Sequence, residues 1–202
     1  MGRKSLKEDR QREIIKVYYK LAKKEGIDNT SIAKIAKAMD INPSLIIHYF
    51  RTREDLTYGL IDYILDKYLL IYKVSPSRSQ SSSEVLLKMI DNLFSKKWNT
   101  LIDDGLFYSC YSLTFRNKRI RGLYKDMLDR LRAELSQQIS LCKEDGVLDV
   151  EEPEEVADAI FVLVDGAYYY LSLVDNKEEY EWKAARYKSQ ALSKLRFRME
   201  EG

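Results

Sequence analysis

The chain has 202 residues and a formal net charge of +2, with 45% hydrophobic and 33% charged residues. This composition can build a core and excludes a chain that is mainly disordered. The longest apolar run, 159–174, is interrupted by Asp165 and Gly166 and is shorter than the roughly 18 apolar residues of a membrane span. The basic N-terminus is followed by no apolar segment, so we expect a cytoplasmic protein with no membrane partner.

The N-terminal quarter shows helical spacing of apolar residues and several helix caps. Ser5 begins a capping-box pattern, and Gly26 is a plausible stop for the helix that follows. Ser31 precedes a short apolar-periodic segment, and Asn42 with Pro43 is typical of a helix start. Thr52 is the expected cap of a fourth helix. The predicted helices cover about 5–25, 32–39, 43–49 and 53–72.

The rest of the chain continues the helical pattern after a Ser-rich linker at 74–83. No alternating strand pattern runs for more than a few residues, so we expect an all-α fold. Gly146 is the expected stop of the longest helix. The predicted helices cover about 84–99, 104–115, 118–145, 153–174 and 178–200.

The two short helices 32–39 and 43–49 are typical of a helix-turn-helix. Ile46 and Phe50 are four residues apart and are expected to face inward, as is the small Ala36, which permits close helix crossing. The outer side of the second helix then carries groups able to contact base edges and phosphates. These are Ser44, Leu45, His48 and Tyr49.

Residues 12–56 resemble the DNA-binding domain of the TetR (tetracycline repressor-like) family. The residues that carry the resemblance are Gly26, Thr30-Ser31, Ile35-Ala36, Ile41, His48-Tyr49-Phe50, Arg53 and Glu54-Asp55-Leu56. Asp40 stands where the family usually has Gly, Ile47 where many members have Tyr, and Arg53 where Lys is usual. Asp tolerates a left-handed turn, and Arg still binds phosphate.

The resemblance implies a helix-turn-helix three-helix DNA-binding domain over 1–53. It also implies a helical effector-binding and dimerisation domain over 54–202. The charge agrees with a DNA-binding head, since residues 1–60 hold 13 Lys and Arg against 8 Asp and Glu. The candidate DNA-binding residues are Arg3, Lys4, Ser31, Lys34, Asn42, Ser44, Leu45, His48, Tyr49 and Arg53. The basic arm with Arg3, Lys4 and Lys7 is either a solvated tail or a minor-groove contact.

Aromatic residues cluster in the C-terminal part and suggest a small-molecule pocket, because apolar walls with a few hydroxyls are typical of ligand sites. Dense packing of tyrosines is the alternative. Asp165 is the one charge within 159–174, and it either binds a cationic or hydroxyl-bearing ligand or pairs locally. The candidate effector-binding residues are Phe107, Tyr108, Tyr111, Tyr124, Met127, Phe161, Asp165, Tyr168 and Tyr169.

The last two predicted helices suggest a dimer interface. Helix 153–174 is apolar on most sides, and a helix of that kind must be covered all round. Together with helix 178–200 from each of two chains, it would form a four-helix interface with two-fold symmetry. Helix 43–49 is the expected recognition helix, which reads the DNA. The two copies of this helix in such a homodimer match a palindromic operator.

Enzyme function is not expected, and neither are cofactors or a metal. His48 is the only histidine, and neither GxGxxG nor GxxxxGK[ST] occurs. Cys110 and Cys142 form no CxxC pair and are expected to be buried, inert thiols. The predicted function is that of a one-component, ligand-responsive regulator of transcription that represses. The alternative is a DNA-targeted helical protein-interaction module that has no small-molecule effector.

Overall fold

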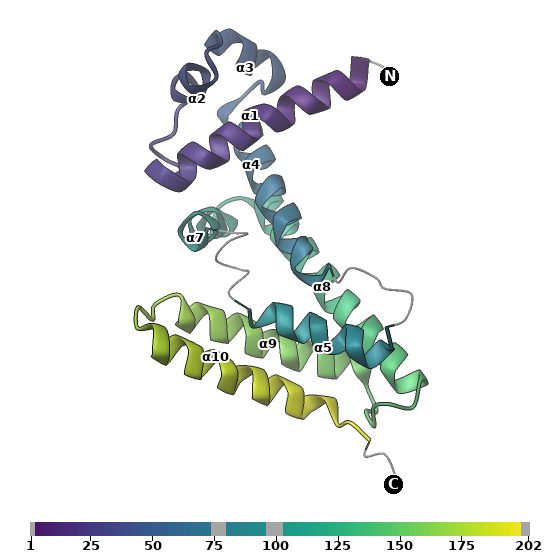
Figure 1. The fold of residues 1–202 in the computed structure, drawn as a ribbon. Coiled ribbons are helices and arrows are strands. Elements are labelled where there is room, and N and C mark those ends of the chain that lie inside the picture. Colours follow the sequence, from purple (N-terminus) through teal and green to yellow (C-terminus); the bar gives the residue numbers. More distant parts are fainter. Residues whose placement is uncertain (1–2, 74–79, 96–102, 199–202) are drawn as a thin grey trace. The chain divides into compact units, whose positions relative to one another are not determined.

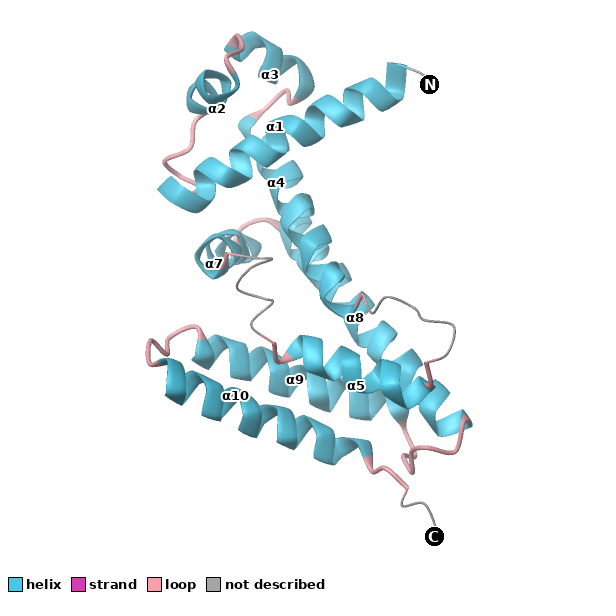
Figure 2. Cartoon of the chain, viewed as in Figure 1, coloured by secondary structure: helices cyan, strands magenta, loops and turns pink. Residues whose placement is uncertain are grey.

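The computed structural model describes residues 3–73, 80–95 and 103–198, and of residues 3–5 and 72 only the backbone. Within these ranges the regular structure is helical (Figure 2). The one exception is an isolated bridge between Leu148 and Phe197. Figure 1 labels the longer elements in chain order. They are α1 (Arg3–Glu25), α2 (Ile32–Met39), α3 (Pro43–Tyr49), α4 (Arg53–Tyr68), η1 (Leu69–Tyr72), α5 (Ser82–Leu93), α7 (Asp104–Ser112), η2 (Leu113–Phe115), α8 (Lys118–Glu144), α9 (Pro153–Leu171), α10 (Lys177–Leu192) and η3 (Ser193–Leu195).

The chain divides into two compact units. The first contains residues 1–68 and 101–125, and the second contains 69–100 and 126–202. The first unit therefore includes α1 to α4, α7, η2 and the first two turns of α8. The predicted division into domains 1–53 and 54–202 stays a prediction.

The local signals of the first unit produce the predicted short helices. Ser31 and Asn42 are the N-caps of α2 and α3, and Pro43 occupies the first turn of α3. Asp40 adopts the left-handed conformation with φ of 53°, and the N–H of Ile41 bonds to the Ala36 carbonyl at 3.0 Å. Gly26 ends α1 with φ of 86°, where a side chain would be strained.

The predicted start of the first helix at Ser5 is wrong. Helix α1 begins at Arg3, so Ser5 lies within its first turn rather than at its cap. Nothing in the sequence just before Ser5 breaks a helix, and the helix continues through it. The buried face of α1 carries Ile14, Ile15, Tyr18 and Ala22, whereas Leu21 is only half-buried.

The second unit packs α10 against both α9 and α5. One face of α9 is buried and includes Ile160, Phe161 and Val164, each at most 3% exposed. The opposite side exposes Val162 at 60% and Tyr169 at 68%. The expectation that this helix is covered all round is therefore not met by the described part of a single chain.

Three predicted helices in the second unit need corrected bounds. Helix α5 begins at Ser82 because Ser81 and Glu84 form a capping box, and it ends at Leu93; residues 96–99 of the prediction lie outside the described residues. Helix α9 stops at Leu171 rather than 174. The last helical turn ends at Leu195, because Arg196 turns left-handed with φ of 36° and the chain then pairs with residues 147–149.

The predicted helix over 104–115 is divided in the structure. Helix α7 ends at Ser112 and is followed by the 3-10 turn η2. Among the described residues, no helix has the length and apolar character needed to cross a membrane.

Candidate nucleic-acid interface

The seven-residue helix α3 presents a polar outer face and a fixed inner face. Ile46 is fully buried and Phe50 is 7% exposed, so both anchor the helix as predicted. Ser44 and His48 are exposed, while Leu45 and Tyr49 are half-buried. The His48 and Tyr49 rings meet edge to face, with centroids 5.3 Å apart. The Ser44 hydroxyl and the His48 imidazole thus lie exposed on a helix that is anchored by its inner face, where they can contact DNA.

Three of the predicted DNA-binding residues also hold the helix-turn-helix together. Ser31 Oγ accepts from the backbone N–H of Lys34 at 3.2 Å, and Asn42 Oδ1 accepts from that of Ser44 at 2.9 Å. The Lys34 ammonium lies 2.5 Å from a Glu25 carboxylate oxygen and keeps the pKa of that carboxyl below its ordinary value. The Lys34 charge is therefore partly neutralised within the chain.

Arg53 lies at the start of α4, next to the α1–α2 connection. Its Nη2 donates to the Asp28 carbonyl at 3.2 Å, and the residue remains exposed. Thr52 and Asp55 form a reciprocal cap, with Asp55 N–H donating to Thr52 Oγ1 at 2.9 Å and Thr52 N–H donating to Asp55 Oδ2 at 3.2 Å. The guanidinium is thus placed at an ordered helix start, where it can bind a phosphate.

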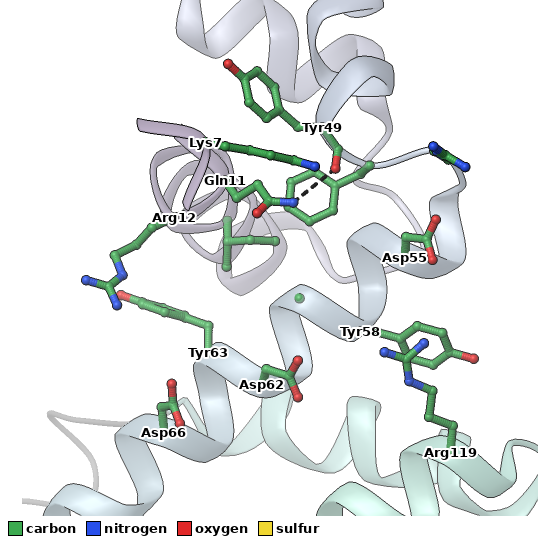
Figure 3. Close-up of a pocket in the computed structure, with 14 residues that line it drawn as sticks. Lys7, Gln11, Arg12, Tyr49, Asp55, Tyr58, Asp62, Tyr63, Asp66 and Arg119 are labelled. Atoms are coloured by element: carbon green, nitrogen blue, oxygen red, sulfur yellow. Dashed lines mark hydrogen bonds between the residues drawn. The ribbon is translucent and has the colours of Figure 1, made fainter. Parts of the chain in front are cut away.

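A contact that the sequence did not reveal joins α1 to the end of α3. Gln11 Nε2 donates to the Tyr49 carbonyl at 3.1 Å (Figure 3). The two residues line a cavity of about 570 Å³, together with Lys7 and Arg51. Lys7 and Arg51 therefore add positive charge beside the end of the recognition helix. Lys7 belongs to the predicted basic arm, whereas Arg51 was not predicted as a DNA-binding residue. No local pattern reveals this cluster, because α1 and α3 are far apart in the chain.

The side chains of Arg3 and Lys4 lie outside the described residues, so the predicted arm contact stays a prediction. The backbone of both residues belongs to α1.

Four of the predicted effector-binding residues form an aromatic cluster within the first unit. Phe107 stacks on Tyr68 with centroids 4.9 Å apart and meets Tyr124 edge to face at 5.4 Å. Tyr111 also contacts Tyr124 at 5.4 Å, and Tyr108 contacts Phe107 at 5.6 Å. Burial strongly raises the pKa of the Tyr124 phenol, whose hydroxyl donates to the Phe107 carbonyl at 3.2 Å.

The other five predicted effector-binding residues belong to the second unit. Met127 and Phe161 are buried, Tyr168 is half-buried, and Tyr169 is 68% exposed. Asp165 pairs locally, since an oxygen of its carboxylate lies 3.9 Å from Arg132 Nη2. The predicted effector-binding role of these residues stays a prediction.

The predicted dimer element carries a hollow of about 720 Å³ on its surface. Its lining combines small and apolar residues of α9 with a more polar edge from α10 and η3. The lining residues are Ala159, Val162, Leu163, Gly166, Ala167, Tyr187, Gln190, Ser193 and Lys194.

The buried thiols show no sign of a reactive site. Cys110 and Cys142 are both free and buried, and desolvation raises the pKa of Cys110 to about 12. The part of the chain that the structure describes holds no group of three or more His, Cys, Asp or Glu arranged to bind a metal ion.

Helix α3 is short and exposed, a tight turn joins it to α2, and α1 supports both. This arrangement defines a helix-turn-helix DNA-binding protein. Two family models match the chain: "Bacterial regulatory proteins, tetR family" at residues 14–57, and "Tetracyclin repressor-like, C-terminal domain" at residues 81–197. The chain therefore belongs to the TetR family of DNA-binding transcriptional regulators.

Individual relatives agree with this assignment. An HTH-type transcriptional regulator of Staphylococcus aureus (strain USA300) is 30% identical over 131 residues, which are 63% of this chain and 67% of that protein. A TetR transcription regulator from Haloarcula marismortui has a TM-score of 0.79 at 18% identity, over 95% of this chain and all of that one. A regulator from Saccharomonospora viridis, solved in complex with choline, has a TM-score of 0.72 at 16% identity, over the same shares. These structural likenesses show the fold.

Proposed function

We propose that the protein is a ligand-responsive repressor that binds a palindromic operator as a homodimer and works in the cytoplasm. The observation that carries this proposal is the exposed outer face of α3. Ser44 and His48 stand free on a helix whose inner side is anchored by the fully buried Ile46. A rigid helix with free polar groups is what major-groove reading requires. Lys7, Arg51 and Arg53 would contact phosphates beside it.

The surface of α9 supports the homodimer. Val162, Tyr169 and Leu173 are each at least 60% exposed, although they lie on or just beyond an apolar helix. Exposed apolar side chains of this density mark an interaction surface. The hollow beside them contains small residues, including Gly166, that allow the helices of a second copy to approach closely. The same patch on both copies would give a two-fold interface.

The aromatic cluster around Phe107 and Tyr124 supports an organic cation as effector. Aromatic ring faces attract quaternary ammonium groups through cation–π interactions. The regulator from Saccharomonospora viridis has choline bound, so choline is the probe we choose for this chain. An effector changes the protein's affinity for the operator only if the effector binds the DNA-bound and the free conformations of the protein with different affinities.

The experiment begins with footprinting on DNA that flanks the protein's own coding region. We expect a protected palindrome, a dimeric mass in solution, and loss of protection when Ser44 and His48 are both changed to Ala. The double change is compared with Ile47→Ala, which alters an exposed apolar residue of the same helix. A monomer without preference for any duplex would overturn the proposal.

The effector is tested by titrating choline into the protein–operator complex. Release of the operator at a saturating concentration supports the cationic effector, and the change Tyr124→Leu should weaken that response. Operator binding that persists at every choline concentration would overturn the choice of an organic cation and favour a DNA-targeted interaction module.

A further inference from the structure

A polar cluster joins the beginning of α4 to the beginning of α8 within the first unit. The Tyr58 hydroxyl donates to Glu54 Oε1, one turn earlier on α4. Asn117 Nδ2 donates both to Glu54 Oε1 and to the Tyr58 oxygen, each at 2.9 Å. The Arg119 guanidinium lies over the Tyr58 ring (Figure 3), and its carbon Cζ is 4.0 Å from the ring centre. We name these four residues the α4–α8 clasp.

The Asn117 side chain performs two tasks with its two ends. Its Oδ1 accepts from the backbone N–H groups of Arg119 at 3.0 Å and Ile120 at 3.1 Å, and so caps α8. Its amino group is then directed to α4, where Nδ2 finds two acceptors. The reverse orientation of the amide would place NH₂ against two N–H donors, so hydrogen bonding allows only this one. One side chain thus starts α8 and ties it to α4.

The clasp holds the end of α4 that adjoins the helix-turn-helix. Glu54 follows Arg53, whose guanidinium donates to the Asp28 carbonyl in the α1–α2 connection. Hydrogen bonds to an ionised carboxylate are stronger and more directional than those between neutral groups. Tyr58 is 9% exposed, and the Asn117 bond to its hydroxyl is partly buried, whereas the bond to Glu54 lies at the exposed surface. A continuous set of contacts therefore runs from the α1–α2 connection through α4 to the cap of α8.

We propose that Asn117 is a positioning residue for operator binding. It fixes the angle of the helix-turn-helix on the first turn of α8, and it thereby sets the distance between half-sites that the protein accepts. Asn117 does not itself contact DNA. This inference rests on the proposed binding of a palindrome by a homodimer. The spacing between half-sites matters only when the DNA-binding domains of both copies bind the same operator.

The change Asn117→Asp separates positioning from capping. Asp is as good an N-cap as Asn, so α8 keeps its start. The new carboxylate at position 117 faces the Glu54 carboxylate in place of an N–H donor, and repulsion between these two like charges breaks the contact between α4 and α8. Affinity is measured on the footprinted operator, on versions with one base pair added or removed between the half-sites, and on a single half-site. We expect about a tenfold loss at the native spacing, a flatter dependence on spacing, and unchanged half-site affinity and salt slope.

Two further variants keep the test decisive. Tyr58→Phe retains the ring beneath Arg119 but removes the hydroxyl, and it should flatten the spacing dependence in the same direction. Asn176→Asp makes the matched change at the cap of α10, where Oδ1 accepts from Glu179 N–H at 2.9 Å, and it should leave the spacing dependence as in the wild type.

The outcomes separate this inference from the proposed function. If wild-type protein shows no preference for a palindrome, the proposed function itself fails. If the wild type binds the palindrome and both clasp variants keep its spacing dependence, only the positioning role is overturned. Equal losses on the half-site and the full operator would also overturn it, because a merely structural role lowers both together.

Discussion

Gly59 on α4 lies so close to Ile15 on α1 that a β-carbon at Gly59 would be 2.9 Å from Ile15 Cδ1. It would also lie 3.1 Å from Cε1 of Phe50, which follows the recognition helix. The two helices therefore approach closely at a point that adjoins the anchor of α3. A β-carbon at position 59 therefore requires Ile15 Cδ1 to shift and the Phe50 ring to give by a few tenths of an ångström.

The change Gly59→Ala should lower stability and operator affinity together. Overpacking of a core contact costs about 1–3 kcal/mol, which exceeds the gain of up to about 1 kcal/mol from replacing glycine in a helix. Chemical denaturation and operator titration measure the two effects. The control is Gly122→Ala in α8, where a β-carbon meets nothing within 4 Å. That variant should gain stability, and an equal gain at position 59 would contradict the close approach.

Adjacent residues of α3 should respond to truncation in opposite ways. Ile46 is fully buried whereas Ile47 is 50% exposed. Ile46→Ala should therefore lower the free energy of unfolding by about 2–5 kcal/mol, and Ile47→Ala should change it by about 0.5 kcal/mol or less. Urea denaturation monitored by circular dichroism distinguishes them. Similar losses for the two variants would show that α3 has a different inner face.

Arg53→Ala should weaken operator binding and make it less sensitive to salt. Loss of one phosphate contact reduces the slope of log affinity against log salt by about 0.9. Fluorescence anisotropy at several salt concentrations measures the slope. Arg116→Ala serves as the control, because Arg116 is an exposed arginine of the same unit outside the predicted interface. An unchanged slope for Arg53→Ala would mean that this guanidinium supports the α1–α2 connection and does not bind phosphate.

Asp165 should make the protein less stable as the pH rises. Burial raises the pKa of its carboxyl to about 6, the nearby Asp158 charge adds to this, and Arg132 opposes it. The unfolded chain ionises this group near pH 4 and the folded chain near pH 6, so the free energy of unfolding falls between these values and stays lower above them. The side chain is 45% exposed, and solvent screening limits the effect to about 1 kcal/mol.

The variant Asp165→Asn should remove this loss. Its thermal midpoint, relative to the wild type, should rise from pH 4 to pH 6 and remain higher at pH 7. Asp175→Asn removes an exposed carboxyl just beyond α9 and should give a constant difference across the same range. The same pH-dependent gain from both variants would assign the effect to net charge instead.

The predicted bounds of α2 and α3 agree with the structure at both ends. Their start and stop signals act within a few residues: Ser31 and Asn42 bond to the first turns, and Asp40 supplies the left-handed turn. Such interactions need no distant partner, so the residue order alone specifies them. The helical class and the family resemblance follow from the same local patterns.

The sequence was a poorer guide where a distant partner competes with local propensity. The last turn of the predicted C-terminal helix is lost because Arg198 N–H bonds to the Val147 carbonyl at 3.0 Å. Helix propensity at residues 196–198 cannot reveal this pairing, since the partner lies about fifty residues earlier. The same applies to the effector region, where chain order gives no guide to which aromatic rings meet.

Sequence by itself determined the helix-turn-helix, its inward and outward faces and the family, because caps and apolar spacing act over three or four residues. Tertiary structure alone decided the contacts of Gln11 with Tyr49 and of Glu54 with Asn117, which join residues 38 and 63 positions apart. Neighbours at that separation depend on how whole helices pack, and packing is settled by the combined burial of many side chains rather than by any short motif.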